Sequence, residues 1–490
     1  MGSEVPTSPP KKLEGYEFYR EVLGSPKYIV APMVDQSELA FRRLTRRYGA
    51  QLVYTPMINA KLFADATKKY RNQFFDIPSG EEGDLKTDRP LIVQFCANDP
   101  EYLLTSAKVV ENHCDGVDIN LGCPQDIARR GYYGAFLQDD WDLIFNLINM
   151  LHKNLAVPVT AKFRIFPSIE KTVEYAQMLE RAGAQILTCH GRLREQRGHN
   201  VGLASYAHIR AVKQNVSVPV FANGNVLFQE DIEECLRETG CDGVMSAEGV
   251  LYNPALFVGL ASSSSSSLPP APSTSTSAPA PDSASDPDTS LLTHHPSCAA
   301  LAQEYLSIVT SMRTPTSASA IKGHLFKLLR PALLKHMDLR ERLGRIKVEQ
   351  FQKAKEKRPL GDDGAPRPFW EKGLEPYIEV VQETAERLVL DEERERAGED
   401  GGEGATRRSV TELLRVQEGT GLKLLPWWLA QPYWRPLPKD PPEDADAGAV
   451  VKKRPLPVVP ADGDALEGPE SGPGKKPKVD SPSALVQALS

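Results

Sequence analysis

The chain has 490 residues and a formal net charge of −7, from 58 basic and 65 acidic side chains. Hydrophobic residues make up 41% of it, which is enough for a sizeable buried core. The acidic balance argues against a uniformly basic nucleic-acid coat, although a local basic face remains open. No apolar run of about 18 residues occurs, so no membrane span is expected.

The cysteines point to a reducing compartment. Seven are scattered along the chain and none forms a Cys-x-x-Cys pair, which excludes a disulfide scaffold and the common zinc spacings. We therefore expect a cytoplasmic protein without a metal site. Separately, we expect a monomer. Two basic motifs in the tail, residues 452–455 and 475–478, leave nuclear import open as an alternative.

The first 27 residues are polar and contain prolines, so 1–27 is expected to be a flexible entry. Short β-branched runs and helix-like stretches such as 38–48 and 169–182 then alternate over 28–260. This alternation predicts crossover connections and an α/β fold with a parallel sheet. Eight such units favour a (β/α)8 TIM barrel over a doubly wound open sheet, which stays open as the alternative. The eight runs are 28–33, 51–57, 90–97, 116–123, 158–165, 185–191, 218–226 and 243–249.

Composition changes sharply after the predicted barrel. Residues 261–297 are rich in Ser, Pro and Ala and are expected to be disordered. Residues 298–358 read as a basic helical domain. Residues 359–490 read as a linker, an acidic helix at 373–396 and a largely disordered tail. An aromatic segment in that tail, 427–434, is expected to dock on the folded body, with base stacking as the alternative.

A thiol stands where the fourth strand run ends. Cys123 lies between Gly122 and Pro124, on a fixed turn rather than inside an apolar run. In a TIM barrel, this end of each strand carries the chemistry. Cys123 is therefore a candidate proton donor or nucleophile. The alternative is a small buried hydrophobe, the usual state of a free cysteine.

Two more strand ends carry ionisable groups. Lys162 lies near the end of an apolar run and either pairs with an anionic ligand or extends outward to water. His190 ends the next run and either donates a hydrogen bond at the barrel mouth or bonds a loop carbonyl. Gln94 ends the third run with a carboxamide that can both donate and accept, which suits the edge of a flavin or pyrimidine ring.

The last two strand runs end in small residues. They are Asn223-Gly224-Asn225 and Ala247-Glu248-Gly249. Such residues let backbone N–H groups approach a phosphate, and these two loops form the usual TIM-barrel phosphate site. Ordinary turns are the alternative. No Gly-x-Gly-x-x-Gly follows a strand and no P-loop motif occurs, which excludes those nucleotide folds.

These segments together resemble the tRNA-dihydrouridine synthases, a flavin-dependent TIM-barrel family. The resemblance covers 28–260. Within it, the sequence motifs are most similar to those of the eukaryotic branch that reduces uridines 16 and 17 in the D-loop of tRNA. The matching segments are 31–44, 93–100, 115–137, 159–165, 188–192, 220–226 and 244–254.

The resemblance implies a cofactor, a reductant and site residues. FMN hydroquinone would supply a hydride to uracil C6, Cys123 a proton to C5, and NADPH would reload the flavin. Lys162 would stabilise the N1/O2 side of the reduced flavin, His190 would bond the flavin or the base, and Gln94 would contact the isoalloxazine edge. Backbone groups of Pro32, Met33 and Val34 would line the flavin, and those of Asn223, Gly224, Asn225, Glu248 and Gly249 would hold its phosphate. Many bacterial members carry Gly-Arg where this chain has Ala247-Glu248, so only the Glu248 amide suits phosphate.

The implied substrate is tRNA. Between Lys322 and Arg358 the sequence has twelve Lys or Arg against four Asp or Glu, which suits contacts with phosphates; a solvated helix surface is the alternative. Two rival functions stay open, a flavin oxidoreductase of a small free substrate and a non-catalytic tRNA-binding or chaperone protein. The predicted substrate contacts are Asn120, Arg129, Arg130, Arg164, Lys322, Arg330 and Arg345.

Overall fold

A computed structural model describes residues 12–67, 71–198, 201–260, 287–346, 373–397, 407–416 and 423–433. Its centre is a barrel of eight parallel strands, which confirms the predicted fold class. The strands are β1 (Tyr28–Val30), β2 (Leu52–Tyr54), β4 (Leu91–Cys96), β5 (Gly116–Leu121), β6 (Val159–Arg164), β7 (Ala184–His190), β8 (Val220–Asn223) and β9 (Gly243–Ser246).

The strands follow one another around the barrel in chain order. β1 pairs with both β2 and β9, and β2 also pairs with β4, so the sheet closes on itself. A ninth, very short strand, β3 (Ile58–Asn59), pairs with the carboxyl end of β4 at Phe95 and Cys96. Closure rules out the doubly wound alternative, because an open sheet has two unpaired edges.

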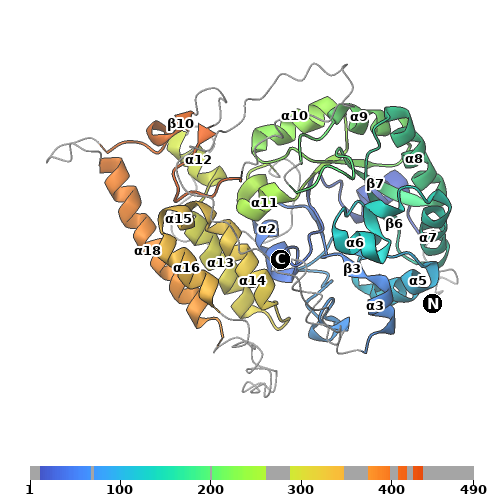
Figure 1. Ribbon diagram of the computed structural model, residues 1–490, viewed down its shortest axis with the longest axis horizontal. Coiled ribbons are helices and arrows are strands. Elements are labelled where there is room, and N and C mark those ends of the chain that lie inside the picture. The colour runs from blue at the N-terminus through green and yellow to red at the C-terminus, as the bar shows by residue number, and fades with distance from the viewer. Residues whose placement is uncertain are drawn as a thin grey trace, which may run out of the picture.

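Helices cover the outside of the barrel (Figure 1). Their apolar faces pack on the outward side chains of the strands, as parallel sheets require. Around the barrel they are α2 (Leu39–Arg47), α3 (Ala60–Asp65), α5 (Pro100–Val110), α6 (Asp126–Gly131), α7 (Trp141–Asn154), α8 (Ile169–Ala182), α9 (Tyr206–Asn215), α10 (Gln229–Thr239) and α11 (Glu248–Tyr252). Short 3₁₀ turns lie at Ile77–Ser79, Glu111–His113, Gly134–Leu137, Pro254–Phe257 and Thr411–Leu413.

The N-terminal segment closes the amino end of the barrel. Described from residue 12 onward, it forms α1 (Gly15–Glu17) and a π-helical turn at Phe18–Val22. Phe18 is fully buried against the apolar barrel interior, and the Tyr16 hydroxyl lies 2.9 Å from Asp242 Oδ1. The flexible entry predicted for 1–27 is therefore wrong for residues 12–27, whose apolar side chains fill the barrel floor.

A helical region packs on one side of the barrel, next to α2 and α11 (Figure 1). Its buried side chains belong to the same apolar cluster as the outer layer of the barrel, so the two parts share one core. The predicted acidic helix at 373–396 is confirmed as α18. The helices of this region are α12 (Pro287–His294), α13 (Cys298–Ser311), α14 (Ala318–Leu328), α15 (Arg330–Lys335), α16 (Met337–Arg345) and α18 (Glu375–Ala397).

One predicted boundary moves. Disorder was expected over 261–297, yet residues 287–297 are ordered. The Asp288 carboxylate there accepts backbone hydrogen bonds from Val410 and Thr411 at 2.8 and 2.9 Å. The composition of this segment does not predict its order, because its partners lie more than a hundred residues further along the chain. Residues 261–286 lie outside the described residues.

A buried polar cluster joins the helical region to the barrel. The Tyr305 hydroxyl donates to Glu38 Oε1 at 2.8 Å, and His324 Nε2 lies 3.0 Å from Glu38 Oε2. Burial alone would raise the pKa of Glu38, but His324 and the two hydrogen bonds outweigh it and lower that pKa. The His324 ring also stacks on Phe41 of α2, with ring centroids 4.3 Å apart.

The aromatic tail segment docks on this region, as predicted. Trp428 is buried, and its carbonyl accepts from the Cys298 amide at 2.9 Å. Trp427 Nε1 donates to Asp391 of α18 at 2.9 Å, and Tyr433 contacts Tyr252 of α11. Two minor antiparallel strands, β10 (Arg415–Val416) and β11 (Lys423–Leu424), lie nearby in sequence. Predictions for 1–11, 347–372, Trp434 and the motifs at 452–455 and 475–478 fall outside the described residues.

No helix among the described residues is long and apolar enough to span a bilayer.

Candidate active site

The predicted site residues converge at the carboxyl end of the barrel. Cys123, Lys162 and His190 all lie where a strand ends, and each is partly exposed there. The other six cysteines are buried. The alternative of a small buried hydrophobe thus holds for those six, whereas Cys123 lies at the barrel mouth.

The Cys123 loop is fixed by bonds from several sides. Asn120 Oδ1 accepts from the Cys123 amide at 2.9 Å and from the Gly122 amide at 3.2 Å. Arg164 Nε donates to the Gly122 carbonyl at 2.8 Å, and the Ala135 amide donates to the Cys123 carbonyl at 3.0 Å. A backbone bonded at so many points holds the thiol in one place, as proton transfer requires.

The Cys123 thiol is mainly protonated at neutral pH. Burial raises its pKa above the ordinary value, while the Gln125 amide and the charges of Arg164 and Lys162 act in the opposite direction. A group that keeps its proton, yet has cations nearby to stabilise the thiolate, is suited to act as an acid. The environment therefore favours the proton donor over the nucleophile.

Lys162 extends into the barrel mouth. Its Nζ donates to Asn223 Oδ1 at 2.9 Å, and Asn223 Nδ2 in turn donates to the Met245 carbonyl at 2.8 Å. Burial, followed by the nearby charge of Arg164, lowers the pKa of Lys162 to about 8. Since Nζ has three hydrogens, donors remain for an anionic ligand. This fits the anion-pairing interpretation and not an outward extension to water.

His190 lies beside a cation that the sequence did not single out. Arg192 Nη1 lies 3.1 Å from His190 Nε2, and its Nη2 donates to Asn225 Oδ1 at 3.2 Å. A guanidinium can only donate, so Nε2 accepts and the imidazole proton is on Nδ1. Burial and the cations around it hold the pKa of His190 well below its usual range. The ring is therefore neutral and can donate from Nδ1.

The loops after β8 and β9 bring backbone close to the mouth. Gly224 has φ +121, and a Cβ there would lie 2.6 Å from the Ala204 Cβ. A Cβ on Gly249 would lie 2.5 Å from the Val226 carbonyl oxygen. Only glycine fits both positions. Asn225, at φ +61, bonds both the amide and the carbonyl of Ala204, which ties the loop after β8 to the loop after β7.

Gln94 is on β4, across the barrel from β8, whereas the β1 loop lies next to β9. Gln94 is fully buried and bonds Asp118 and Asn120, so its direct contact with a flavin stays a prediction. Pro32, Met33 and Val34 follow β1 and are partly exposed. The Met33 amide and carbonyl both bond the Ser37 hydroxyl, which fixes this loop.

These residues suit the coenzyme that the resemblance implies. Lys162, Arg164, His190 and Arg192 place cations and hydrogen-bond donors along the β6 and β7 side of the mouth. A reduced flavin has an anionic ring edge, and its phosphate carries further negative charge. The glycines of the loops after β8 and β9 pack closely on Ala204 and Val226, and the backbone N–H groups of these loops are the candidate donors for that phosphate. The donor set therefore fits an anionic coenzyme such as FMN.

The predicted tRNA contacts separate into two groups. Arg129 and Arg130 are exposed on α6, directly after the Cys123 loop. Arg164 is only 8% exposed and donates to the carbonyls of Gly122, Leu193 and Gln196. Its role in holding these loops was missed from sequence, because its partners lie in two loops that are distant from it along the chain.

The basic helical region is partly neutralised. Lys322 donates to the carbonyls of Gly344 and Ile346, and the Arg330 guanidinium lies 3.8 Å from the Tyr433 ring centroid. Arg345 pairs with Glu341 at the surface. The described part of this region, 322–346, retains seven Lys or Arg against two Asp or Glu. Lys322 and Arg330 thus also have roles within the fold, and the predicted contacts of Lys322, Arg330 and Arg345 with tRNA stay predictions.

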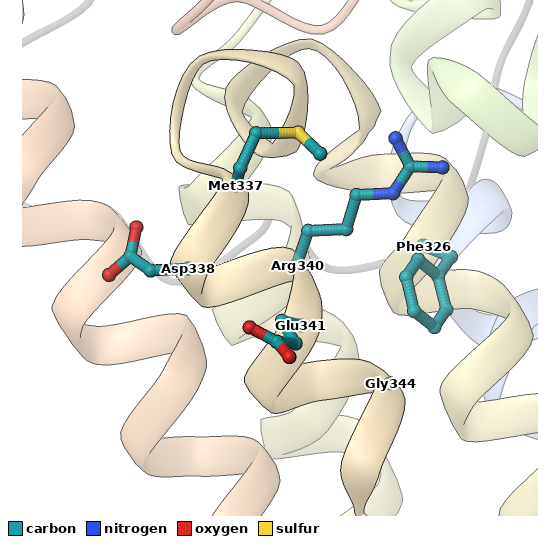
Figure 2. Close-up of a pocket in the computed structure, with 6 residues that line it drawn as sticks. All are labelled: Phe326, Met337, Asp338, Arg340, Glu341 and Gly344. Carbon is teal, nitrogen blue, oxygen red and sulfur yellow. The ribbon is translucent and has the colours of Figure 1, made fainter. Parts of the chain in front are cut away.

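A shallow hollow lies on this region, away from the strand ends. Figure 2 shows Arg340 and Phe326 facing each other across it, while Asp338 points toward α18. Asp338 forms an ion pair with Arg387 of α18. Within the described part of the chain Arg340 makes no ion pair, and its side chain is exposed. Sequence reasoning missed Arg340, because only the folded structure shows which basic side chains of this region have partners within the protein.

The family model described as "Dihydrouridine synthase (Dus)" matches residues 29–354. The match spans the barrel, the Cys123 loop and most of the helical region. The chain belongs to the dihydrouridine synthase family. Among the described residues of this dihydrouridine synthase, no group of three or more His, Cys, Asp or Glu is placed to bind a metal ion.

Several relatives of this dihydrouridine synthase have specific names. The "tRNA-dihydrouridine(16/17) synthase [NAD(P)(+)]" of Schizosaccharomyces pombe is 42% identical over 92% of this chain and 96% of its own. The Saccharomyces cerevisiae protein of the same name is 43% identical over 87% of this chain and 88% of its own. The human "tRNA-dihydrouridine(20a/20b) synthase [NAD(P)+]-like" protein is 40% identical over 47% of this chain and 70% of its own.

Proposed function

We propose that this dihydrouridine synthase reduces uridines 16 and 17 of tRNA, with FMN as its coenzyme and NADPH as reductant. The two fungal relatives named for positions 16 and 17 match about nine-tenths of this chain, including sequence beyond the barrel. The human relative named for 20a and 20b matches 47% of it. The longer matches favour positions 16 and 17, and the names of all three relatives support NAD(P)H as the reductant.

The observation that carries the chemistry is the placement of Cys123 at the barrel mouth, where burial raises the pKa of its thiol. Reduction of the uracil C5=C6 bond adds a hydride at C6 and a proton at C5; FMN, when bound, supplies the hydride. The Cys123 S–H bond breaks and its proton goes to C5. The thiolate left behind is stabilised by the charges of Lys162 and Arg164. Water then re-protonates the thiol between turnovers.

Other residues bind and orient the coenzyme. Lys162, held by Asn223, would face the ring edge, and neutral His190 would donate from Nδ1. Backbone N–H groups of the loops after β8 and β9 would hold the phosphate. Glu248 contributes only its backbone there, since a carboxylate repels phosphate. Arg192 lies close enough to add a guanidinium to the same end.

The substrate uridine must leave its stack to reach Cys123. The enzyme then has to hold the remaining tRNA by its phosphates. Arg129 and Arg130 are exposed beside the Cys123 loop, and Arg340 and Arg345 are exposed on α16. We assign these exposed side chains to phosphate contacts, for which Arg345 would exchange its surface pair with Glu341.

The direct test is dihydrouridine mapping on unmodified tRNA transcripts incubated with the purified full chain and NADPH. We expect dihydrouridine at positions 16 and 17 and none at 20a or 20b, and transcripts with cytidine at 16 and 17 should stay unmodified. Modification only at 20a or 20b would overturn the assignment. Activity on free uridine but not tRNA would favour the small-substrate oxidoreductase. Binding of tRNA by a colourless, inactive protein would favour the non-catalytic alternative.

A further inference from the structure

A row of buried polar side chains runs across three strands beneath the Cys123 loop. The Thr160 hydroxyl donates to Asp118 Oδ1 at 2.6 Å, and Gln94 Nε2 donates to Asp118 Oδ2 at 2.7 Å. Asn120 Nδ2 then donates to Gln94 Oε1 at 2.9 Å. The row ends at the backbone, where Asn120 Oδ1 accepts from the Cys123 amide at 2.9 Å. Asp118 and Gln94 are both fully buried.

From the Cys123 amide to Asp118, the hydrogen bonds of this row all run in one donor-to-acceptor direction, and the acceptor at Asp118 determines that direction. Although burial raises the pKa of Asp118 to about 6, each of its two oxygens accepts a hydrogen bond, Oδ1 from the Thr160 hydroxyl and Oδ2 from Gln94. The Gln94 amide nitrogen must therefore face Asp118, which turns its oxygen toward Asn120. That oxygen in turn draws the Asn120 nitrogen, so the Asn120 oxygen faces the loop amides. Without a fixed acceptor at position 118, both carboxamides could turn over.

We propose that Asp118 is a positioning residue, which acts through Gln94 and Asn120 to hold the backbone amide of Cys123 and so to place its thiol. The inference rests on the proposed role of Cys123 as proton donor. If both carboxamides turned over, the Asn120 NH₂ group would meet the two backbone N–H groups of the loop. Donors facing donors cannot bond, and the loop would shift.

The charge of Asp118 is not the required feature. An asparagine at position 118 could place its oxygen toward Gln94 and its nitrogen toward the Thr160 hydroxyl, which can rotate to accept. The direction of the row would survive. Thr160→Val removes one donor to Asp118 but leaves the carboxylate facing Gln94, so it is the matched control for disturbing the barrel interior without reversing the row.

The test combines kinetics on unmodified tRNA with alkylation of Cys123 by iodoacetamide. The other six cysteines are buried, so labelling reports on this thiol alone. For Asp118→Ala we expect kcat to fall about tenfold or more with KM for tRNA unchanged, because small misplacements of a reacting group are costly. Labelling should accelerate several-fold as the loop loosens. Asp118→Asn should recover most of both properties relative to Asp118→Ala, and Thr160→Val should label within about twofold of the wild-type rate.

The proposal is overturned if folded Asp118→Ala labels at the wild-type rate, or if Asp118→Asn or Thr160→Val is as impaired as Asp118→Ala. If Asp118→Ala does not fold, Gln94→Met breaks the next link and carries the same expectations. The labelling rate does not depend on turnover. A failure of Cys123 as the proton donor would therefore appear as turnover by Cys123→Ala, while the positioning by Asp118 would still be read from the labelling.

Discussion

Among single residues, Cys123 and Lys162 have pKa values that suit the proposed chemistry. Burial raises the pKa of the Cys123 thiol and lowers that of the Lys162 ammonium to about 8. The first group therefore keeps its proton at neutral pH, and the second changes charge just above it. One is suited to give a proton away and the other to attract an anion.

Cys123→Ala removes the proposed proton donor and little else. We expect kcat on unmodified tRNA to fall by about two orders of magnitude or more, the usual contribution of a positioned acid. The yellow absorbance of the bound coenzyme and the affinity for tRNA should stay near wild type, because the loop is held through its backbone. Stopped-flow turnover together with a visible spectrum checks this, and unchanged turnover would refute the role of Cys123.

Lys162 gives a pH prediction for coenzyme binding. Its pKa of about 8 means that the free protein carries the Lys162 charge below that pH and loses it above. The affinity of coenzyme-free protein for FMN should therefore fall as pH rises through about 8. This pH-dependent loss of affinity should be absent in Lys162→Met, which should bind FMN weakly at every pH. It should be smaller in Lys162→Arg than in the wild type. Fluorescence titrations with FMN at pH 7 and 9 measure this change. An equal change in FMN affinity for wild type and Lys162→Met would contradict the role of Lys162 in coenzyme binding.

Among the helices and turns, the segment after α6 is shaped to fit the thiol loop. Gly134 has φ +66, and a Cβ there would lie 2.7 Å from the Cys123 carbonyl oxygen and 3.0 Å from its Cβ. The glycine thus serves two purposes, a left-handed backbone and a close approach. Gly240, at the end of α10, has nearly the same φ of +67, but a Cβ there would meet no neighbouring atom within 4 Å.

This pair of glycines separates backbone strain from displacement of the loop. Both Gly134→Ala and Gly240→Ala should destabilise the fold by about 1 kcal/mol through the left-handed backbone alone. Only Gly134→Ala should also lower kcat and change the labelling rate of Cys123, because its new methyl group pushes the loop. Thermal unfolding and turnover of both variants are the measurements. Equal turnover in the two would show that the close approach of Gly134 to Cys123 does not matter.

In the molecule as a whole, the helical region is part of the enzyme's core and not an attachment. Glu38, Tyr305 and His324 are bonded across the junction, and one apolar cluster spans both sides. Acidic α18 pairs with α16, as in Arg342 with Glu383 and Arg387 with Asp338. Deleting the region would expose this core, so charge substitutions are the cleaner way to probe its surface.

The affinity for tRNA should fall as the salt concentration rises. Exposed arginines near the barrel mouth should contribute to the slope of log affinity against log salt concentration. Replacing both Arg129 and Arg130 by Ala should weaken binding to all tRNAs alike and reduce the slope of log affinity against log salt by about one for each phosphate that is no longer bound. Arg20→Ala is the matched control, because Arg20 is exposed at the opposite, amino end of the barrel. An Arg20 variant that weakened binding equally would refute this placement.

The barrel and most of its mouth could be predicted from the order of residues alone. Strand and helix periods are local, and strand ends such as those at Cys123, Lys162 and His190 can be read from a few neighbours. Other features became visible only in the folded chain, because they depend on partners far apart in sequence. His324 meets Glu38 across 286 residues, and Arg164 meets Gly122 across 42. The same holds for the N-terminal closure of the barrel and for which cations stay free, because pairing between distant segments leaves no periodic trace in the chain.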